Sequence, residues 1–298
     1  MNCACTWSSR AAGECVLPGG SVGAVHPIEH LRFIARSSGA DQRALVHESA
    51  SALRALGDDP AGVVVSCRRI LERHPSAGAL WWFAATMLSA SDPRAAAAAA
   101  AAEVTDDPTP DELAAALPDG ATVCLVGWPD LIGDALVRRG DVTVLVVDTS
   151  LGGPASRGDA TGRDLVRRLE RAETPAELVD PAGIAGAVQA SDIVLVEALA
   201  ASPGELLVAA GSRGAASIAY CSEVPVWGVV GVGRVLPVTL FAASAELATA
   251  ASRPWHAAAE TLPLGLISDV IGPSGLRQRP DALEPACAAV PELVRLGR

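Results

Sequence analysis

The chain has 298 residues, half of them apolar and 3% aromatic, and its formal net charge is -11 at pH 7. That charge disfavours nucleic-acid binding, which needs clustered cations, and no apolar run approaches the roughly 18 to 20 residues that span a bilayer. We therefore expect a cytoplasmic protein with neither a nucleic-acid partner nor a membrane partner. All 23 basic residues are arginine, which excludes a Walker-type phosphate loop and Schiff-base catalysis, because both need lysine. Seven cysteines without a CxxC spacing argue against a zinc cluster, and we expect no metal and no cofactor.

The first third of the chain is predicted to be helical. We expect residues 1–25 to be a disordered leader and residues 26–105 to form a helical domain, because apolar residues repeat there at three-to-four spacing. Asp41 is placed to cap the second of these helices. The segment 80–88 gathers most of the aromatic side chains, so we expect it at the centre of a small bundle.

From residue 118 to residue 276 the pattern changes to strands alternating with helices. Short apolar runs predict strands and amphipathic segments predict helices between them, at 122–126, 131–139, 142–147, 163–171, 176–179, 184–189 and 193–196. We expect residues 262–270 to form a further helix and residues 277–298 a partly ordered tail. The order predicts an α/β chain, with an N-terminal helical bundle followed by a Rossmann-like, doubly wound, mostly parallel sheet domain.

The stretch Asp192–Pro237 is the predicted centre of the sheet domain. Its apolar runs and its alanine-rich segment at about 214–220 indicate two buried parallel strands joined by a crossover helix. Before that helix, the backbone, hydroxyl and guanidinium donors of Gly211, Ser212 and Arg213 are expected to meet at a helix N-terminus. Because such a terminus binds anions, these residues are candidate ligands of a phosphoryl group.

Other polar residues follow the predicted strands directly. Gly127 and Trp128 follow the first strand, Asp148 and Ser150 the second, and Glu197 the central one. Doubly wound sheets bind ligands at the carboxyl ends of their strands, so all five are candidate ligand residues. Glu197 could hold a ribose hydroxyl, and a solvated or ion-paired glutamate is the alternative. Trp128 is expected to be buried in the core or in an interface, with base stacking as the alternative.

Several segments, taken in order, resemble the family of translation initiation factor 2B alpha, beta and delta subunits, which also contains methylthioribose-1-phosphate and ribose-1,5-bisphosphate isomerases. Ser191–Val196 resembles the family's Asp-x-Val-Leu-Val strand, Val224–Trp227 its Val-Pro-Val-Tyr strand, and Leu262–Ile267 with Gly272–Gly275 its closing segment. The resemblance extends from residue 26 to about residue 276. It implies a helical domain, a Rossmann-like sheet and a homodimer formed through the sheet domain, with the apolar run Val226–Val238 as the suspected contact patch.

The chain departs from this resemblance where the isomerases carry their catalysts. Their catalytic cysteine lies in a Gly-Cys-Asn-Thr-Gly loop, which corresponds to Gly127-Trp128-Pro129-Asp130 here. Their catalytic aspartate corresponds to Leu199, with Glu197 two residues earlier. Arg157 or Arg163 could replace the arginine of the family's Ser-Arg-Pro loop, which this chain lacks. The resemblance therefore implies that phosphate-binding groups are kept while the acid and base needed for proton transfer between sugar carbons are lost.

These departures favour an initiation factor 2B-like protein that binds a phosphorylated sugar or nucleotide without catalysis and works as a sensor or assembly protein. The first alternative is a sugar-phosphate aldose-ketose isomerase with rearranged catalytic residues, for which Glu197 and Asp148 are the candidate bases. The second, implied by the resemblance alone, is a translation initiation factor-like regulatory subunit. A phosphorylated small molecule is the expected partner in the first two cases.

Overall fold

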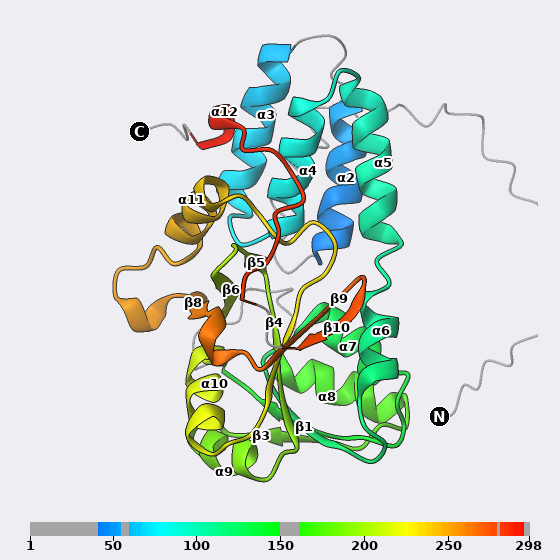
Figure 1. Cartoon of the computed structure of the whole chain (residues 1–298), viewed down its shortest axis with the longest axis vertical. Helices are drawn as coiled ribbons and strands as arrows, with labels where there is room; N and C mark the ends of the chain where they lie inside the picture. Colours follow the sequence, from blue (N-terminus) through cyan, green and yellow to red (C-terminus); the bar gives the residue numbers. More distant parts are fainter. Residues whose placement is uncertain (1–40, 55–59, 150–160, 279–280, 295–298) are drawn as a thin grey trace, which may run out of the picture.

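The computed structural model describes residues 41–54, 60–149, 161–278 and 281–294. In Figure 1 a body of helices stands above a body built on a sheet. The expected leader at residues 1–25 and two candidate ligand residues, Ser150 and Arg157, lie outside the described residues. Within the described residues, no helix is long and apolar enough to cross a membrane.

The helical body is built around one helix that is apolar on all sides. α4 (Gly78–Ser89) is surrounded by α2 (Gln42–Arg54), α3 (Pro60–Arg73) and α5 (Pro93–Thr105), and it buries Trp81, Trp82 and Phe83 almost completely. At about 25 cal/mol per Å² of apolar surface removed from water, three buried rings in one turn contribute strongly to the stability of this body. This aromatic turn therefore holds the helical body together, as the sequence predicts.

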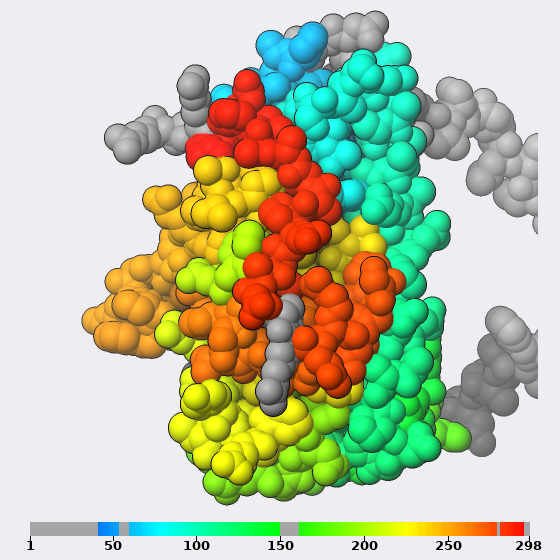
Figure 2. All heavy atoms as spheres, viewed as in Figure 1, coloured from blue at the N-terminus to red at the C-terminus, as the bar shows by residue number. Residues whose placement is uncertain are grey.

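The end of the chain completes the helical body. α11 (Val238–Ala248) packs on α4, and α12 (Pro291–Val294) packs on α3 and α11. Buried apolar residues of these segments, Leu240, Phe241 and Leu293, belong to the same core as Trp82. Figure 2 shows the C-terminal segment, coloured red, running over the front of the molecule up to the helices. Within the tail that was expected to be partly ordered, Val290 and Leu293 are buried in this core, while most other described residues of 281–294 are exposed.

The lower body is built on a seven-stranded sheet. Its strands are β1 (Thr122–Val126), β2 (Thr143–Val147), β3 (Ala176–Val179), β4 (Ile193–Glu197), β7 (Val226–Val229), β9 (Asp269–Gly272) and β10 (Gly275–Gln278). They lie in the order β10-β9-β7-β4-β1-β2-β3, and all neighbours are parallel except β10, which is antiparallel to β9. The predicted α/β class with a mostly parallel sheet is thus confirmed.

Helices cover both faces of this sheet, because alternate strand residues are apolar on opposite faces. Val123 and Leu125 of β1 pack with α6 (Thr109–Ala116), α7 (Asp130–Leu136) and α8 (Gly162–Arg171). Cys124 and Val126 pack on the other face with α9 (Ile184–Gln189) and α10 (Ser212–Cys221). A strand buried on both faces has a nearly continuous apolar sequence, which is why β1 and β4 could be predicted.

The prediction fails in the segment between β4 and β9. A small antiparallel sheet, with strand order β5-β6-β8, is formed by β5 (Ala200–Ala201), β6 (Glu205–Ala209) and β8 (Ala259–Pro263). The predicted helix at 262–270 is therefore wrong: that segment ends β8, passes through a single 3-10 turn and begins β9. Its apolar residues have helical spacing, but pairing with β6 and β7 overrides that local preference.

The apolar run Val226–Val238, suspected as a dimer contact, lies mostly inside the protein. β7 pairs with β4 on one side and β9 on the other, and its four residues are buried. At the far end of the run, Leu236 is buried and Val238 is 63% exposed. The run is therefore a core strand with its following loop, and the expected contact patch is wrong for all but its last residues.

Candidate functional site

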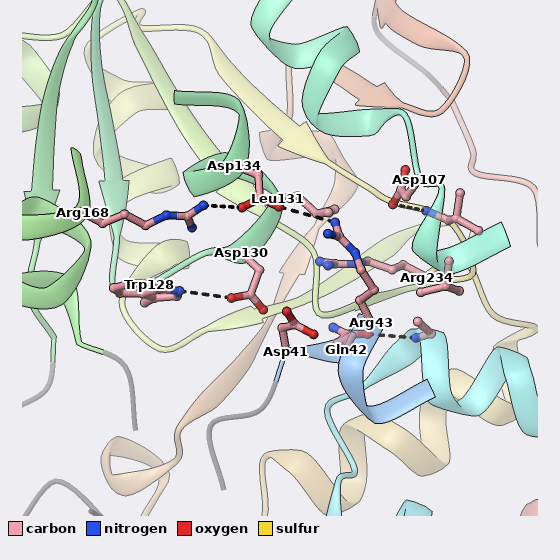
Figure 3. A pocket seen from close by; sticks show the side chains of 13 residues that line it. Asp41, Gln42, Arg43, Asp107, Trp128, Asp130, Leu131, Asp134, Arg168 and Arg234 are labelled. Carbon is pink, nitrogen blue, oxygen red and sulfur yellow. Dashed lines mark hydrogen bonds and ion pairs between the residues drawn. The ribbon is translucent and has the colours of Figure 1, made fainter. Parts of the chain in front are cut away.

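A cleft of about 240 Å³ lies where the helical body meets the carboxyl ends of β1 and β7. Figure 3 shows its polar side chains converging from both bodies. Four aspartates and three arginines line it: Asp41, Asp107, Asp130, Asp134, Arg43, Arg168 and Arg234. Ligand pockets commonly exceed about 300 Å³, so this cleft suits a small, strongly polar molecule.

The loop after β1 supplies one wall of the cleft. Gly127 has a φ of +72°, and after it Trp128 donates a hydrogen bond from Nε1 to Oδ1 of Asp130 over 3.1 Å. The pKa of Asp130 is raised to about 7, mainly by burial and next by the negative charge of Glu197. Arg234 lowers this pKa, and Asp41 raises it further. A carboxyl group with such a pKa exchanges its proton near neutral pH.

A buried ion pair forms the floor beneath this wall. Arg234 Nη1 lies 2.7 Å from Oε1 of Glu197 and 2.5 Å from the carbonyl oxygen of Ala198, and both charged side chains are 5% exposed. The second carboxylate oxygen of Glu197 accepts the amide of Ile132 at 3.0 Å. Both oxygens of Glu197 are therefore used by the protein itself. Of the two alternatives that the sequence leaves open, the ion-paired glutamate fits this geometry.

The loop that carries Arg234 is pressed against the helical body. Gly233 has a φ of +71°, and a Cβ placed on it would come within 2.7 Å of the Trp82 ring. Only glycine fits both the backbone conformation and the space. The aromatic core of the helices thus fixes the position of Arg234, and through it the floor of the cleft.

Two arginines at another side of the cleft share a single carboxylate. Arg43 Nη2 lies 3.4 Å from Oδ2 of Asp134, and Arg168 Nη2 lies 2.6 Å from Oδ1 of the same residue. Arg43 comes from α2 and Arg168 from α8, and their side chains are 36% and 33% exposed. Two cations beside one anion leave this side of the cleft with a net positive charge and with guanidinium donors directed to solvent.

The remaining polar residues of the cleft hold its two halves together. Gln42 accepts the amide of Ala79 and donates to the carbonyl of Leu199, each over 2.9 Å. Asp107 accepts the amide of Val232 over 2.9 Å. Asp41 accepts the amide of Ala44 at 2.6 Å, so its predicted role as a helix cap is confirmed. The bonds from Gln42 to Leu199 and from Val232 to Asp107 join the helical side of the cleft to the loops of the sheet.

The start of α10, predicted to bind a phosphoryl group, is already occupied by a carboxylate of the protein. Glu260 of β8 accepts the amide of Gly211 at 2.7 Å and the amide of Arg213 at 2.9 Å. The guanidinium of Arg213, an exposed residue, approaches the carbonyl oxygen of Thr261 at 3.4 Å. The donors at this helix start therefore meet an internal anion. With Glu260 in this place, the amides of Gly211 and Arg213 are not available to an external phosphoryl group, and a ligand role for Gly211, Ser212 and Arg213 stays a prediction.

Gly211 fits this arrangement closely. Its φ is +96°, and an added Cβ would lie 2.7 Å from the side chain of Thr149, beyond the end of β2. The glycine that suggested a phosphate-binding loop is needed instead for this close approach of two loops. Ser212 is buried beside it.

The other predicted ligand residues do not meet at the cleft. Asp148 follows β2, and Arg163 is exposed at the second position of α8, yet neither lines the cleft among the residues described. Five residues further along α8, Arg168 does line it. Of the predicted set, Trp128 lies in the wall, Gly127 precedes it and Glu197 lies beneath.

Sequence reasoning missed most of the cleft because its residues come from both bodies. Arg234 carried a usable signal: it stands alone in an apolar run, and a buried arginine needs an acidic partner. In the sequence, Asp130 is one polar residue at the end of the loop after β1, and Arg43 is one of several polar residues of α2. Their convergence depends on how the helical body packs against the sheet, which no local spacing reveals.

The described cysteines are all unpaired. Cys67 and Cys124 are buried, and burial raises the pKa of each thiol to about 12, so they behave as small apolar side chains. Cys221 is exposed, because it ends α10 on the solvent side. Within the described ranges, no group of three histidine, cysteine or acidic residues is placed to hold a metal ion.

Comparisons with known proteins find the fold but no sequence relative. No family model and no curated protein matches the sequence. The translation initiation factor eIF-2B of Pyrococcus horikoshii OT3 matches with a TM-score of 0.68 at 14% identity, over 85% of this chain and 97% of that one. eIF2B beta of Chaetomium thermophilum matches with 0.62 at 15% identity, over 85% and 88%. A chain of the tetrameric eIF2B-beta2-delta2 complex of C. thermophilum matches with 0.63 at 16% identity, over 85% and 90%.

Proposed function

We propose that this chain, which has the fold of the initiation factor 2B structures, binds a small phosphorylated polyol in the cleft between its two bodies and does so without catalysis. The proposal keeps the expected ligand class, a sugar phosphate or a nucleoside monophosphate, and moves its site from the start of α10 to the cleft. One observation carries it: Arg43 and Arg168 face the cleft from opposite bodies and share the single carboxylate of Asp134.

Phosphoryl recognition is assigned to these two arginines. A guanidinium offers a planar set of donors that matches phosphate oxygens, and bonds of this kind are among the strongest in proteins. Because each arginine uses one terminal nitrogen on Asp134, the remaining donors can receive a dianion. The polyol hydroxyls are assigned to the acidic wall of Asp41 and Asp130, which lies across the same cleft.

A non-catalytic role is favoured over the isomerase alternative. Glu197, one candidate base, is buried and held by Arg234 and by the amide of Ile132. Asp148, the other, lies outside the residues that line the cleft. A base must reach the proton that it removes, and neither carboxylate is placed to do so from a ligand in this cleft.

Assembly is the second part of the proposal. We propose a homodimer formed through the sheet body, and the oligomeric state of the initiation factor complex named above supports it by analogy of fold. A cytoplasmic location belongs to the same proposal, because four unpaired described cysteines are usual in a reducing compartment. Light scattering of the purified protein tests the dimer, and a monomer at micromolar concentration would contradict it.

The binding proposal is tested by isothermal titration with D-ribose 5-phosphate and with AMP. We expect saturable binding, weakened roughly tenfold or more in Arg168→Ala and Arg43→Ala, since each change removes a charge-assisted contact. Arg163→Ala is the matched control: it removes an exposed arginine of α8 that does not line the cleft, and it should bind like the wild type. No heat from either ligand, or an equal loss in all three variants, would overturn the proposal.

A further inference from the structure

The acidic wall of the cleft contains one carboxyl group in an unusual setting. Asp130 lies in the first turn of α7, lines the cleft and points toward Asp41, which approaches from the start of α2 (Figure 3). One of its oxygens, Oδ1, accepts a hydrogen bond from the indole N–H of Trp128. Its second oxygen is the part of the group left to meet a ligand in the cleft.

The charges around Asp130 do not balance in its immediate surroundings. Glu197 from β4 and Asp41 from α2 face it with negative charge, and Arg234 from the loop after β7 faces it with positive charge. Arg234, however, is bonded to Glu197 and to a backbone carbonyl. Asp107, in the loop before α6, is a further charged residue of the cleft. The others form one group, in which Arg43 on α2 and Arg168 on α8 both bond Asp134 on α7.

This crowding favours the neutral form of the group. Burial, and after it the charges of two neighbouring carboxylates, outweigh a single guanidinium that is already engaged, and they raise the pKa of Asp130 to about 7. A neutral carboxyl group carries a hydroxyl donor, whereas a carboxylate only accepts. A doubly charged ligand entering the cleft adds further negative charge and shifts the group still more toward the protonated form.

We propose that Asp130 binds the ligand as a neutral carboxylic acid that donates its proton in a hydrogen bond to an oxygen of the ligand, so that binding takes up a proton from solution. This inference rests on the proposed phosphorylated ligand and narrows it. The ligand must present a hydrogen-bond acceptor beside its phosphoryl group, such as a hydroxyl or ring oxygen of the polyol. Asp130 thus selects among phosphorylated molecules, and binding is favoured below neutral pH.

The test measures proton uptake directly. D-ribose 5-phosphate is titrated calorimetrically at pH 7.5 into wild type, Asp130→Asn and Asp106→Asn, each in HEPES and in Tris, whose ionisation enthalpies differ. The difference in heat between buffers gives the number of protons taken up. Asparagine keeps the size of the neutral acid and a donor group, and Asp106 is an exposed aspartate outside the cleft, which makes Asp106→Asn the matched control.

On binding the ligand, wild type and Asp106→Asn should each take up more protons than Asp130→Asn does, by a fraction of one proton per ligand bound. Protonation of the phosphoryl group itself is common to all three proteins and cancels in that difference. Between pH 6 and pH 8 the affinity of wild type relative to Asp130→Asn should fall roughly tenfold. Circular dichroism shows whether the variant is folded, and the pH dependence of wild type alone gives a second measurement.

The outcomes separate the two proposals. Binding by all three proteins with equal proton uptake and equal pH dependence overturns the role of Asp130 and leaves the binding site in place. Absence of binding to every protein at every pH, with AMP as well as with ribose 5-phosphate, overturns the proposed function and this inference together.

Discussion

The start of α10 and the cleft beside α7 are two places where this fold gathers anion-binding groups, and the chain treats them in opposite ways. At α10 the amides of Gly211 and Arg213 are filled by the carboxylate of Glu260. At the cleft, Arg43 and Arg168 share one carboxylate between them. A motif with the right donors therefore does not identify a site until the positions of the chain's own acids are known.

The largest expected effect concerns the floor of the cleft. Arg234→Met removes the cation from a pair in which Glu197 is 5% exposed, and the carboxylate is left buried without its partner. We expect the free energy of unfolding to fall by roughly 3 to 5 kcal/mol, measured by urea denaturation. The double variant Arg234→Met with Glu197→Leu should regain much of this loss. A single-variant loss below about 1 kcal/mol would mean that the cleft does not depend on this pair.

The next prediction concerns how the free energy of unfolding depends on pH through Asp130, in the acidic wall of the cleft. Native Asp130 has a pKa of about 7, against about 3.9 in an unfolded chain, so between those values the native state holds a proton that the unfolded state has released. Its stabilising contribution is complete below about pH 4 and is lost as the pH rises to about 7. Asp130→Asn should therefore be more stable than wild type by roughly 2 to 4 kcal/mol at pH 8, and about equal at pH 4.

Urea denaturation at both pH values checks this prediction. Asp106→Asn, which changes an exposed aspartate, should follow the wild type at each. A difference between Asp130→Asn and wild type that stays constant with pH would show that the carboxyl group titrates normally and that the wall is not crowded.

A smaller effect is expected at the start of α10, where removal of Glu260 should open the helix terminus to an external anion. Glu260→Ala leaves the amides of Gly211 and Arg213 without their acceptor, and we expect a loss of roughly 1 to 3 kcal/mol. Sulfate should restore part of it, because the open helix start can then bind an external anion. Thermal melts in sulfate and in chloride measure both effects. Glu177→Ala, at an exposed position of β3, is the control, and equal stabilisation of both variants by sulfate would contradict the idea.

The smallest effect tests a predicted ligand residue. Arg163 is exposed near the start of α8, so Arg163→Ala should change the free energy of unfolding by no more than about 0.5 kcal/mol. Chemical denaturation measures this change. A clear loss of stability would show that this arginine has a structural role that its exposure does not suggest.

Much of the sheet could be predicted from the sequence, because strands such as β1 and β4 are buried on both faces and are therefore continuously apolar. The small antiparallel sheet could not. β6 and β8 lie some 50 residues apart and gain their structure from each other, while β8 has apolar residues at a spacing that also suits a helix. The failure at 262–270 is thus a tertiary effect on an ambiguous segment.

The candidate site was predicted less well than the fold. Trp128 and Glu197 were found because they lie at the carboxyl ends of strands, Trp128 two residues after β1 and Glu197 as the last residue of β4, and position along a strand is visible in sequence. Arg43, Asp134 and Arg168 belong to three different helices, and each has the spacing of an ordinary surface residue. Glu260, which accepts the amides at the start of α10, lies 47 residues beyond Arg213. No local sequence pattern connects the two residues.

The position of α11 and α12 has a consequence for synthesis. Leu240, Phe241 and Leu293 cover the same core as Trp82, so the helices made first lack part of their covering until residues 240–293 have been made. Domains often fold in the order in which they are made, but this helical body is complete only after the sheet body has been synthesised. A nascent chain released early would carry its largest aromatic cluster uncovered, and would be a natural substrate for chaperones.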